Sequence, residues 1–376
     1  MNCLITGINY NNIGSVLMLN ALIENIDQKM NLIISPATPK IHFKTEKLKL
    51  LKEPLPLFGN AKFKIYMNFP LLVRFIKEIK KGEYSMSDID IIIDISGFAF
   101  GDQWGAFPAH NLNILIKKAS KLKKLILLPQ AFGPFNSFEL KMEMKKIIES
   151  ASMIYARDEQ SFSFLKFIAP SSKNIKCFPD TTLTYNIQFD HEDKNYISII
   201  PNMRMLDKGG EWKNLYKVVL SKCIDYVLTQ TSLNVKLIIH DSGNEDILIA
   251  TELQNKASNK RVQIIEYVDH RMTKKIIANS KLVISSRFHA LASALSTNVP
   301  SISLSWSHKY YELMKDYNIE RFNHSLPNED KIIKQLGELL EKELYQNVKK
   351  QLLTSNTKIK SASKIMWEEV NSLISL

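Results

Sequence analysis

The stretch 281-KLVISSRFHALASAL-295 carries a buried strand that passes directly into a helix. Residues 282–284 are apolar, two of them are β-branched, and a pair of serines follows, which is typical of a central strand in a parallel sheet. After the serines, Phe288, Leu291, Ala292 and Leu295 recur at helical spacing and form one apolar stripe. A strand that feeds a helix is the repeating unit of sheets wrapped by helices. The stretch therefore predicts an α/β fold.

The same unit recurs along the chain in two series. The first series has predicted strands at 2–8, 90–96, 124–130 and 152–157, with helices near 15–27, 109–122 and 137–150. The second has predicted strands at 196–202, 235–241, 262–267, 281–286 and 300–306, with helices at 211–230, 245–257, 271–279 and 287–297. The charged segment 184–196 between them loses the periodicity. Two series with one break indicate two domains.

We therefore predict two doubly wound, Rossmann-like α/β domains that face each other across a cleft, followed by a helical tail. The predicted parts are a first domain at 1–186, a linker at 187–195, a second domain at 196–327 and an amphipathic helical segment at 328–376. Ligands of such sheets bind beyond the carboxyl ends of the strands. We expect the functional residues in the loops that follow strands.

Composition narrows the class of protein. The 376 residues suit two domains, and no apolar run approaches the roughly 18–20 residues of a membrane-spanning helix. The first residues lack a basic segment ahead of an apolar one, so we expect no secretory signal. Three widely spaced cysteines favour a reducing compartment over a disulfide framework. We expect a cytoplasmic protein.

The net charge of +12 comes from lysine far more than from arginine. Of 50 basic residues, seven are arginine, and a surface that reads nucleic acid is expected to use more of them. We therefore expect no nucleic-acid partner. Two interpretations remain open: a solvated lysine-rich surface, and weak attraction to an anionic membrane surface.

The start of the helix after 281–286 is the strongest candidate binding site. Ser285 or Ser286 can cap the helix, and Arg287 and His289 lie in its first turn, off the apolar stripe. Cations at a helix N-terminus are unfavourable unless an anion is bound there. We predict an anion site at Arg287 and His289; the alternative is an arginine paired with a nearby carboxylate and a packed histidine.

A second arginine follows a strand of the first domain. Arg157 precedes Asp158 and Glu159, which open a helix favourably for its dipole. We predict that Arg157 binds the same anion from the other domain, and a surface ion pair is the alternative. After the last strand, His308 and Lys309 offer further positive charge to a negative ligand.

Polar loops of the first domain predict a sugar-binding face. Asp102, Gln103 and Trp104 follow a central strand and combine carboxylate, amide and indole, which suit sugar hydroxyls and an apolar sugar face. We add Gln130, at another strand end, and the pair Asn11 and Asn12, in the loop before the first helix. Structural turns are the alternative for each of these loops.

The sequence contains no pattern typical of a metal site. None of the eight histidines has metal-ligand spacing such as His-x-x-x-His. Asp88 and Asp90 form an Asp-x-Asp pair, but they precede a strand, so we interpret them as capping residues. We predict neither a metal nor an organic cofactor.

Together the motifs resemble the polysaccharide pyruvyl transferase family. The motifs run in order over residues 5 to about 312: 11-NNIGS-15, 96-SGFAFGDQWG-105, 129-PQAFGPF-135, 157-RDEQS-161, 179-PD-180, 285-SSRFHALASAL-295 and 306-WSHKY-310. The sequence departs from the family pattern at Ser15, where an Asp is usual, and at Ser96-Gly97-Phe98, where three glycines are usual. Both departures lie in the first domain, on the expected acceptor side.

The resemblance implies a GT-B-like fold and a defined reaction. Such enzymes move the pyruvyl group of phosphoenolpyruvate onto two sugar hydroxyls and form a ketal. The family's donor signature corresponds to Arg287, Phe288 and His289, with Arg157 as a further donor arginine. His289 has the pKa range for proton transfer near neutrality, and Asp102 is our candidate for activating the acceptor hydroxyl.

The resemblance also implies a setting. The acceptor is expected to be a sugar of a cell-surface polysaccharide or its lipid-linked precursor, with phosphoenolpyruvate as co-substrate. A lipid-linked acceptor would bring the enzyme to the inner face of the membrane. Two alternatives stay open: a GT-B glycosyltransferase that uses a nucleotide sugar, and a non-catalytic glycan-binding member of an export assembly.

Overall fold

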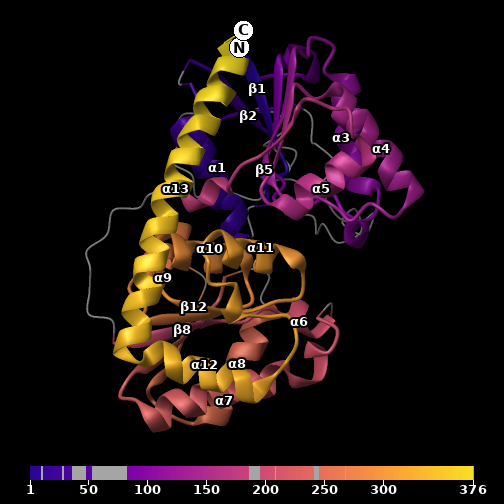
Figure 1. Ribbon diagram of the computed structural model, residues 1–376. Helices are drawn as coiled ribbons and strands as arrows, with labels where there is room; N and C mark the ends of the chain where they lie inside the picture. The colour runs from indigo at the N-terminus through magenta and orange to yellow at the C-terminus, as the bar shows by residue number, and fades with distance from the viewer. Residues whose placement is uncertain are drawn as a thin grey trace, which may run out of the picture. The chain divides into compact units, whose positions relative to one another are not determined.

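The computed structural model describes residues 1–9, 12–27, 29–35, 48–52, 83–185, 195–207, 209–240, 245–266 and 268–375. Two compact units divide them (Figure 1). Unit 1 comprises residues 1–10, 18–181 and 364–376, and unit 2 comprises 11–17 and 182–363. The divisions at 17 and 363 fall inside two helices, α1 (Ile13–Asn25) and α13 (Lys342–Ser375). Residues 186–194, which include 187–194 of the predicted linker, lie outside the described part.

Unit 1 is built on a parallel sheet with the strand order β3-β2-β1-β4-β5-β6-β7. The strands are β1 (Asn2–Thr6), β2 (Asn31–Ile34), β3 (Leu48–Leu50), β4 (Ile91–Asp94), β5 (Lys124–Gln130), β6 (Met153–Ala156) and β7 (Ile175–Cys177). All four residues of β4 are buried, as a strand covered on both faces requires. The central strands thus match the predicted apolar runs.

Three helices of unit 1 lie together on one side of its sheet (Figure 1). They are α3 (Phe107–Lys118), α4 (Phe138–Ser150) and α5 (Glu159–Ile168). Ser137 caps α4 through Leu140 N at 3.4 Å, and Asp158 caps α5 through Ser161 N at 2.7 Å. These caps fix where each helix begins, directly beyond the strand ends.

Unit 2 has a six-stranded parallel sheet with the order β10-β9-β8-β11-β12-β13. The strands are β8 (Tyr196–Ile200), β9 (Asn234–Ile238), β10 (Val262–Ile265), β11 (Leu282–Ser285), β12 (Ser301–Leu304) and β13 (Asn323–His324). The helices are α6 (Arg204–Asp207), α7 (Trp212–Gln230), α8 (Glu245–Ala257), α9 (His270–Ala278), α10 (Phe288–Ser296), α11 (His308–Asp316) and α12 (Glu329–Leu340).

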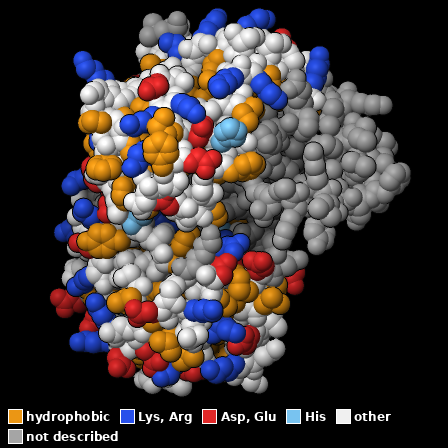
Figure 2. All heavy atoms as spheres, turned by 90° about the vertical axis from the view of Figure 1, so that its right-hand side faces the viewer, with side chains coloured by type: hydrophobic (Ala, Val, Ile, Leu, Met, Phe, Trp, Pro, Cys, Tyr) orange, Lys and Arg blue, Asp and Glu red, His pale blue; other side chains and the backbone are white. Residues whose placement is uncertain are grey.

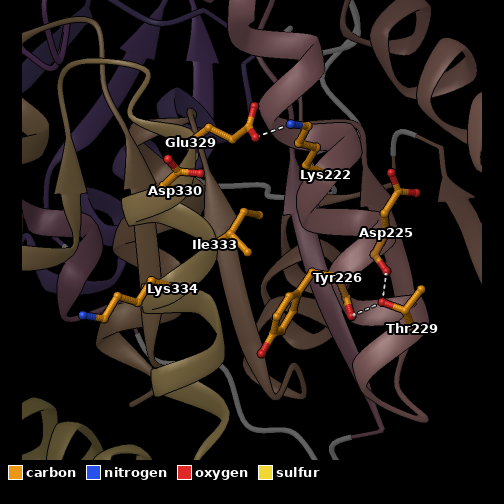
Figure 3. Close-up of a pocket in the computed structure, with 8 residues that line it drawn as sticks. All are labelled: Lys222, Asp225, Tyr226, Thr229, Glu329, Asp330, Ile333 and Lys334. Carbon is orange, nitrogen blue, oxygen red and sulfur yellow. Dashed lines mark hydrogen bonds and ion pairs between the residues drawn. The ribbon is translucent and has the colours of Figure 1, made fainter.

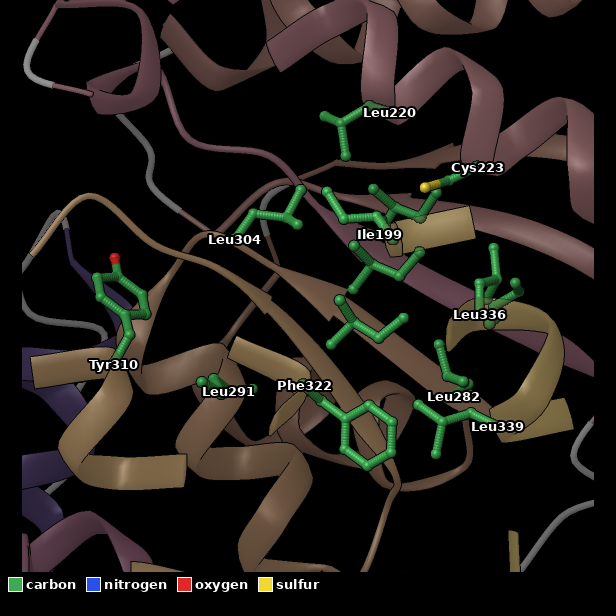
Figure 4. Close-up of a cluster of buried hydrophobic side chains, with 14 of the residues drawn as sticks. Ile199, Leu220, Cys223, Leu282, Leu291, Leu304, Tyr310, Phe322, Leu336 and Leu339 are labelled. Carbon is green, nitrogen blue, oxygen red and sulfur yellow. The ribbon is translucent and has the colours of Figure 1, made fainter. Parts of the chain in front are cut away.

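One large apolar cluster fills unit 2 between the sheet and its helices (Figure 4). Leu291 and Leu295 of α10 belong to this cluster, as their predicted stripe requires. Leu282 and Ile284 of β11 join them from the strand. Burial of each such side chain contributes about 1.5–3 kcal/mol to the free energy of folding. The stripe leaves residues 287 and 289 off the core.

The predicted α/β class, with two helix-covered parallel sheets and a helical C-terminal tail, is confirmed. The strands β2, β3, β7 and β13, each of two to four residues, and the helices α6 and α11 were not predicted from the sequence. Strands this short lack the repeat that a periodicity argument needs. No helix in the described part of the chain is both long and apolar enough to cross a membrane.

Candidate functional site

Arg287 lies at the junction of β11 and α10 in unit 2. Its Nε and Nη2 atoms donate to Oδ2 of Asp246, at 2.9 and 2.5 Å. Asp246 is buried at the start of α8, and its Oδ1 accepts from Met203 N at 2.9 Å. The paired-carboxylate alternative is therefore present. The pair holds one edge of the guanidinium in a fixed direction, while the side chain stays 16% exposed.

Buried hydrogen bonds lock the turn that presents Arg287. The Ser286 carbonyl accepts from Tyr310 Oη at 2.6 Å and from Asn202 Nδ2 at 2.8 Å. Tyr216 Oη donates to Ser286 Oγ at 2.7 Å, and burial raises the pKa of this phenol. Arg287 N donates to Ser285 Oγ at 3.0 Å. Hydrogen bonds from three separate segments hold this turn, so the backbone that carries Arg287 has little conformational freedom.

His289 stands in the first turn of α10 and is partly exposed. A methyl group added at Gly14 would lie 1.9 Å from its Nδ1 atom, so the backbone of α1 packs directly on the imidazole. Asn12 Oδ1 accepts from Gly14 N at 2.9 Å and fixes this helix start. Glycine is thus required here by the close approach of the histidine.

The start of α1 belongs to unit 2, unlike the loop of Asp102, Gln103 and Trp104, which belongs to unit 1. The sequence alone places Asn12 in the same domain as that loop. In the structure the start of α1 joins unit 2 instead, because Gly14 packs on His289. Acceptor binding by Asn12 stays a prediction, and Asn11 lies outside the described residues.

A buried histidine near Arg287, His240, was not among the residues predicted from the sequence. It lies just beyond the end of β9 and is 2% exposed. Its Nε2 atom has no hydrogen-bond partner among the described residues. Burial, then the charges of Arg287 and His289, lower its pKa well below the ordinary value of 6.5. The rule that ligands bind beyond strand ends would have found His240 and Asp246.

Lys309 lies among aromatic rings beyond β12. Its Nζ atom is 5.0 Å from the ring centre of Trp306, 5.4 Å from Tyr310 and 5.7 Å from Phe288. Such contacts hold an ammonium group without neutralising it. Phe288 also packs edge-on against His289, with ring centres 5.2 Å apart. The structure thus brings Phe288, His289 and Lys309 together, and His308 precedes the lysine as the first residue of α11.

In unit 1, Arg157 is enclosed. Its side chain is 3% exposed, and Nη1 donates to Oδ2 of Asp180, also buried, at 3.0 Å. The sequence offered a surface ion pair as the alternative, whereas the pair with Asp180 is a buried one that the sequence did not indicate. A donor contact for Arg157 stays a prediction.

Gln130 belongs to a buried network at the strand ends of unit 1. Its Nε2 atom donates to Asp94 Oδ1 at 3.0 Å, and Thr6 and Ser96 donate to Asp94 Oδ2 at 2.7 and 3.0 Å. Gln130 is fully buried, and its Oε1 atom lacks a partner among the described residues. The network ties β1, β4 and β5 together. A contact between Gln130 and an acceptor stays a prediction.

Asp102 braces two loops of unit 1. Its carboxylate accepts from the backbone amides of Asn136 at 2.7 Å and Ser137 at 3.0 Å, just before α4. Gln103 and Trp104 follow in the same short 3-10 helix, and the indole is 40% exposed. Activation of an acceptor hydroxyl by Asp102 stays a prediction. The hydroxyl would have to compete with these two amides for the carboxylate.

No set of three His, Cys, Asp or Glu side chains in the described ranges could hold a metal ion. Asp88 and Asp90 both do structural work. Asp88 accepts from Ser85 N at 2.9 Å in a capping box, and Asp90 accepts from Asn2 N at 2.9 Å. The capping interpretation is confirmed for Asp88. Asp90 instead holds the first residue of β1 in place.

A shallow groove of about 510 Å³ runs between α7 and α12 of unit 2 (Figure 3). Its walls carry an ion pair between Lys222 and Glu329 and the ring of Tyr226. None of the site residues predicted from the sequence lines it. The groove therefore adds nothing to the candidate site.

Comparison with solved structures defines the class of fold. HepE from Anabaena, solved with UDP and glucose, matches with a TM-score of 0.59 at 11% identity, over 100% of this chain and 99% of that chain. MnaA from S. aureus, solved with UDP, matches with 0.56 at 12%, over 93% and 90%. UDP-GlcNAc 2-epimerase from Methanocaldococcus jannaschii matches with 0.52 at 14%, over 91% and 94%. The protein has a GT-B-like α/β fold.

The sequence itself identifies the family. The family model of polysaccharide pyruvyl transferase matches residues 12–308, a range that includes Gly14, His240 and the β11–α10 junction. The chain therefore belongs to the polysaccharide pyruvyl transferase family, as its motifs predict. A comparison with curated protein sequences finds no match.

Proposed function

We propose that the protein transfers the pyruvyl group of phosphoenolpyruvate to two hydroxyls of a sugar and forms a pyruvate ketal with release of phosphate. The observation that carries the proposal is the group of Arg287, His289 and Lys309 in unit 2, at the N-terminus of α10. A guanidinium, an ammonium and the positive end of a helix suit a small ligand with both a carboxylate and a phosphate.

In this reaction each proton that leaves a hydroxyl must have an acceptor, and the methylene carbon must have a proton donor. One acceptor hydroxyl adds to the central carbon of the enol while the methylene carbon gains a proton and becomes a methyl group. The second hydroxyl adds to the same carbon as the C–O bond to phosphate breaks, and its proton leaves with the phosphate. His289 is suited to move the first proton because an unperturbed imidazole titrates near neutrality. Arg287 and Lys309 offset the charge that develops on phosphate.

The acceptor is, on this proposal, a sugar of a surface polysaccharide or its lipid-linked precursor. The exposed indole of Trp104 and the amide of Gln103 support a sugar-binding loop in unit 1. No metal or organic cofactor takes part, because Arg287 and Lys309 would supply the charge that a metal would otherwise offer. The free cysteines Cys3, Cys177 and Cys223 support work in the reducing cytoplasm. A lipid-linked acceptor would bring the enzyme to the inner face of the membrane.

A donor screen tests the proposal. Purified protein is incubated with lysate glycans and either phosphoenolpyruvate, UDP-glucose or UDP-GlcNAc, and released phosphate and UDP are measured. We expect glycan-dependent phosphate release with phosphoenolpyruvate and no UDP release. UDP release from a nucleotide sugar would favour the glycosyltransferase alternative, and glycan binding without release of either product would favour a non-catalytic role.

A further inference from the structure

Unit 1 exposes aromatic side chains together on one side. All its large exposed apolar side chains in the described ranges, apart from Met1 and Ile365, lie on α3, α4 and α5 or in the 3-10 helix just before α3. They are Trp104, Phe107, Phe138, Met142 and Phe167, which we call the α3–α5 face. Phe138 and Phe167 are 77% and 78% exposed. Exposed phenylalanines in such a group indicate a surface that something covers.

Hydrogen bonds and a cation–π contact connect the elements that carry these residues. Asp102 binds the backbone amides of Asn136 and Ser137, which places the loop of Trp104 beside the start of α4. Asn113 of α3 donates to Glu143 of α4 at 2.6 Å. Lys141 of α4 lies 5.9 Å from the ring centre of Phe167 on α5. The three helices therefore present a continuous side.

Positive charge gathers in the same segment. Residues 107–176, which contain α3, α4 and α5, hold eleven Lys and the buried Arg157 against five Asp and Glu, so this fifth of the chain carries +7 of the total +12. On α4, Phe138, Lys141, Met142 and Lys145 recur at i, i+3, i+4 and i+7, and thus share one side of the helix. Figure 2 shows this side of the molecule, with apolar side chains and lysines interspersed.

We infer that the α3–α5 face docks on an anionic lipid surface. Aromatic rings suit the boundary between headgroups and acyl chains, while lysine side chains extend from an apolar stem to anionic headgroups. A protein partner would be expected to meet a more continuous apolar core with fewer lysines. The inference rests on the proposed function in one respect: a lipid-linked acceptor would give the docking its purpose.

Vesicle sedimentation tests the assignment. Wild-type protein is spun with vesicles of phosphatidylcholine alone or with 30% phosphatidylglycerol, at low and at high salt. We expect binding to the anionic vesicles that high salt reverses. The double variants Phe138→Ser/Phe167→Ser and Lys141→Glu/Lys145→Glu should each weaken binding by at least about tenfold. The matched control Leu248→Ser/Leu353→Ser, at exposed positions of unit 2, should bind as wild type.

Three results would overturn the assignment. Wild-type protein does not bind anionic vesicles, or the control variant loses as much binding as the two test variants, or the protein self-associates without lipid and Phe138→Ser/Phe167→Ser abolishes that association. The last would mean that a second copy covers the face.

Thermal unfolding checks that every variant is folded. Calorimetry with phosphoenolpyruvate, expected to be unchanged in all three variants, separates the two claims. Vesicle binding without donor binding would refute the proposed function alone.

Discussion

Arg287 and Arg157 follow the same local pattern in two units, but their side chains differ in exposure to solvent. Each arginine comes after a parallel strand, precedes a helix and binds a buried aspartate. The side chain of Arg287 is 16% exposed and adjoins His240 and His289, whereas that of Arg157 is 3% exposed. The first pair leaves part of the guanidinium accessible, and the second pair is part of the interior. We therefore propose that the same motif serves a ligand site in unit 2 and mainly stability in unit 1.

The largest expected effect concerns the buried pair. Arg157→Ala would leave the Asp180 carboxylate buried without its cation, which typically costs about 3–5 kcal/mol of unfolding free energy. Urea denaturation measures it. The control is Arg204→Ala, whose pair with Asp207 is exposed and is expected to change stability by less than about 1 kcal/mol. Equal effects would mean that the Arg157 pair contributes no more than a surface pair.

The second prediction separates catalysis from stability in unit 2. His289→Gln should keep the fold and donor binding, while turnover falls by about 10²–10⁴, because a positioned acid or base is lost. Steady-state phosphate release measures it once an acceptor is found. A variant within fivefold of wild type would assign His289 to packing.

The third prediction tests whether the start of α1 positions His289. Gly14→Ala should lower turnover by about 10², the effect of a displacement near 1 Å, since the new methyl group overlaps the imidazole. The same change in a His289→Ala background should leave stability unchanged or higher, because alanine favours helices. Equal losses of stability in both backgrounds would show that Gly14 does not act through His289.

A smaller effect follows from the pKa of His240. The folded state holds this imidazole neutral because its pKa is lowered by burial, while the unfolded chain takes up a proton near pH 6.5. Stability is therefore lost as pH falls below about 6.5, by up to about 1.4 kcal/mol per pH unit. His240→Asn should reduce that slope in denaturation between pH 6.5 and 5. An unchanged slope would show that His240 does not contribute to it.

The sequence predicts what is local and misses what is distant. The passage from β11 into α10 follows from fifteen consecutive residues, and the central strands follow from their apolar runs. The partner of Arg287 is 41 residues away in α8, and the packing of Gly14 on His289 joins residues far apart in the chain. No periodicity encodes such contacts. The burial of Arg157 was missed for the same reason, because Asp180 comes from beyond β7.

Calorimetric titration with phosphoenolpyruvate shows whether unit 2 holds the donor site. Wild-type protein should bind it, and Arg287→Lys, which loses the planar fork, should bind more weakly by about 1.5–3 kcal/mol. Arg204→Lys, at an exposed position of the same unit, should bind as wild type. Equal donor affinity in wild type and Arg287→Lys, or no binding by wild-type protein, would contradict the assignment of the donor site to unit 2.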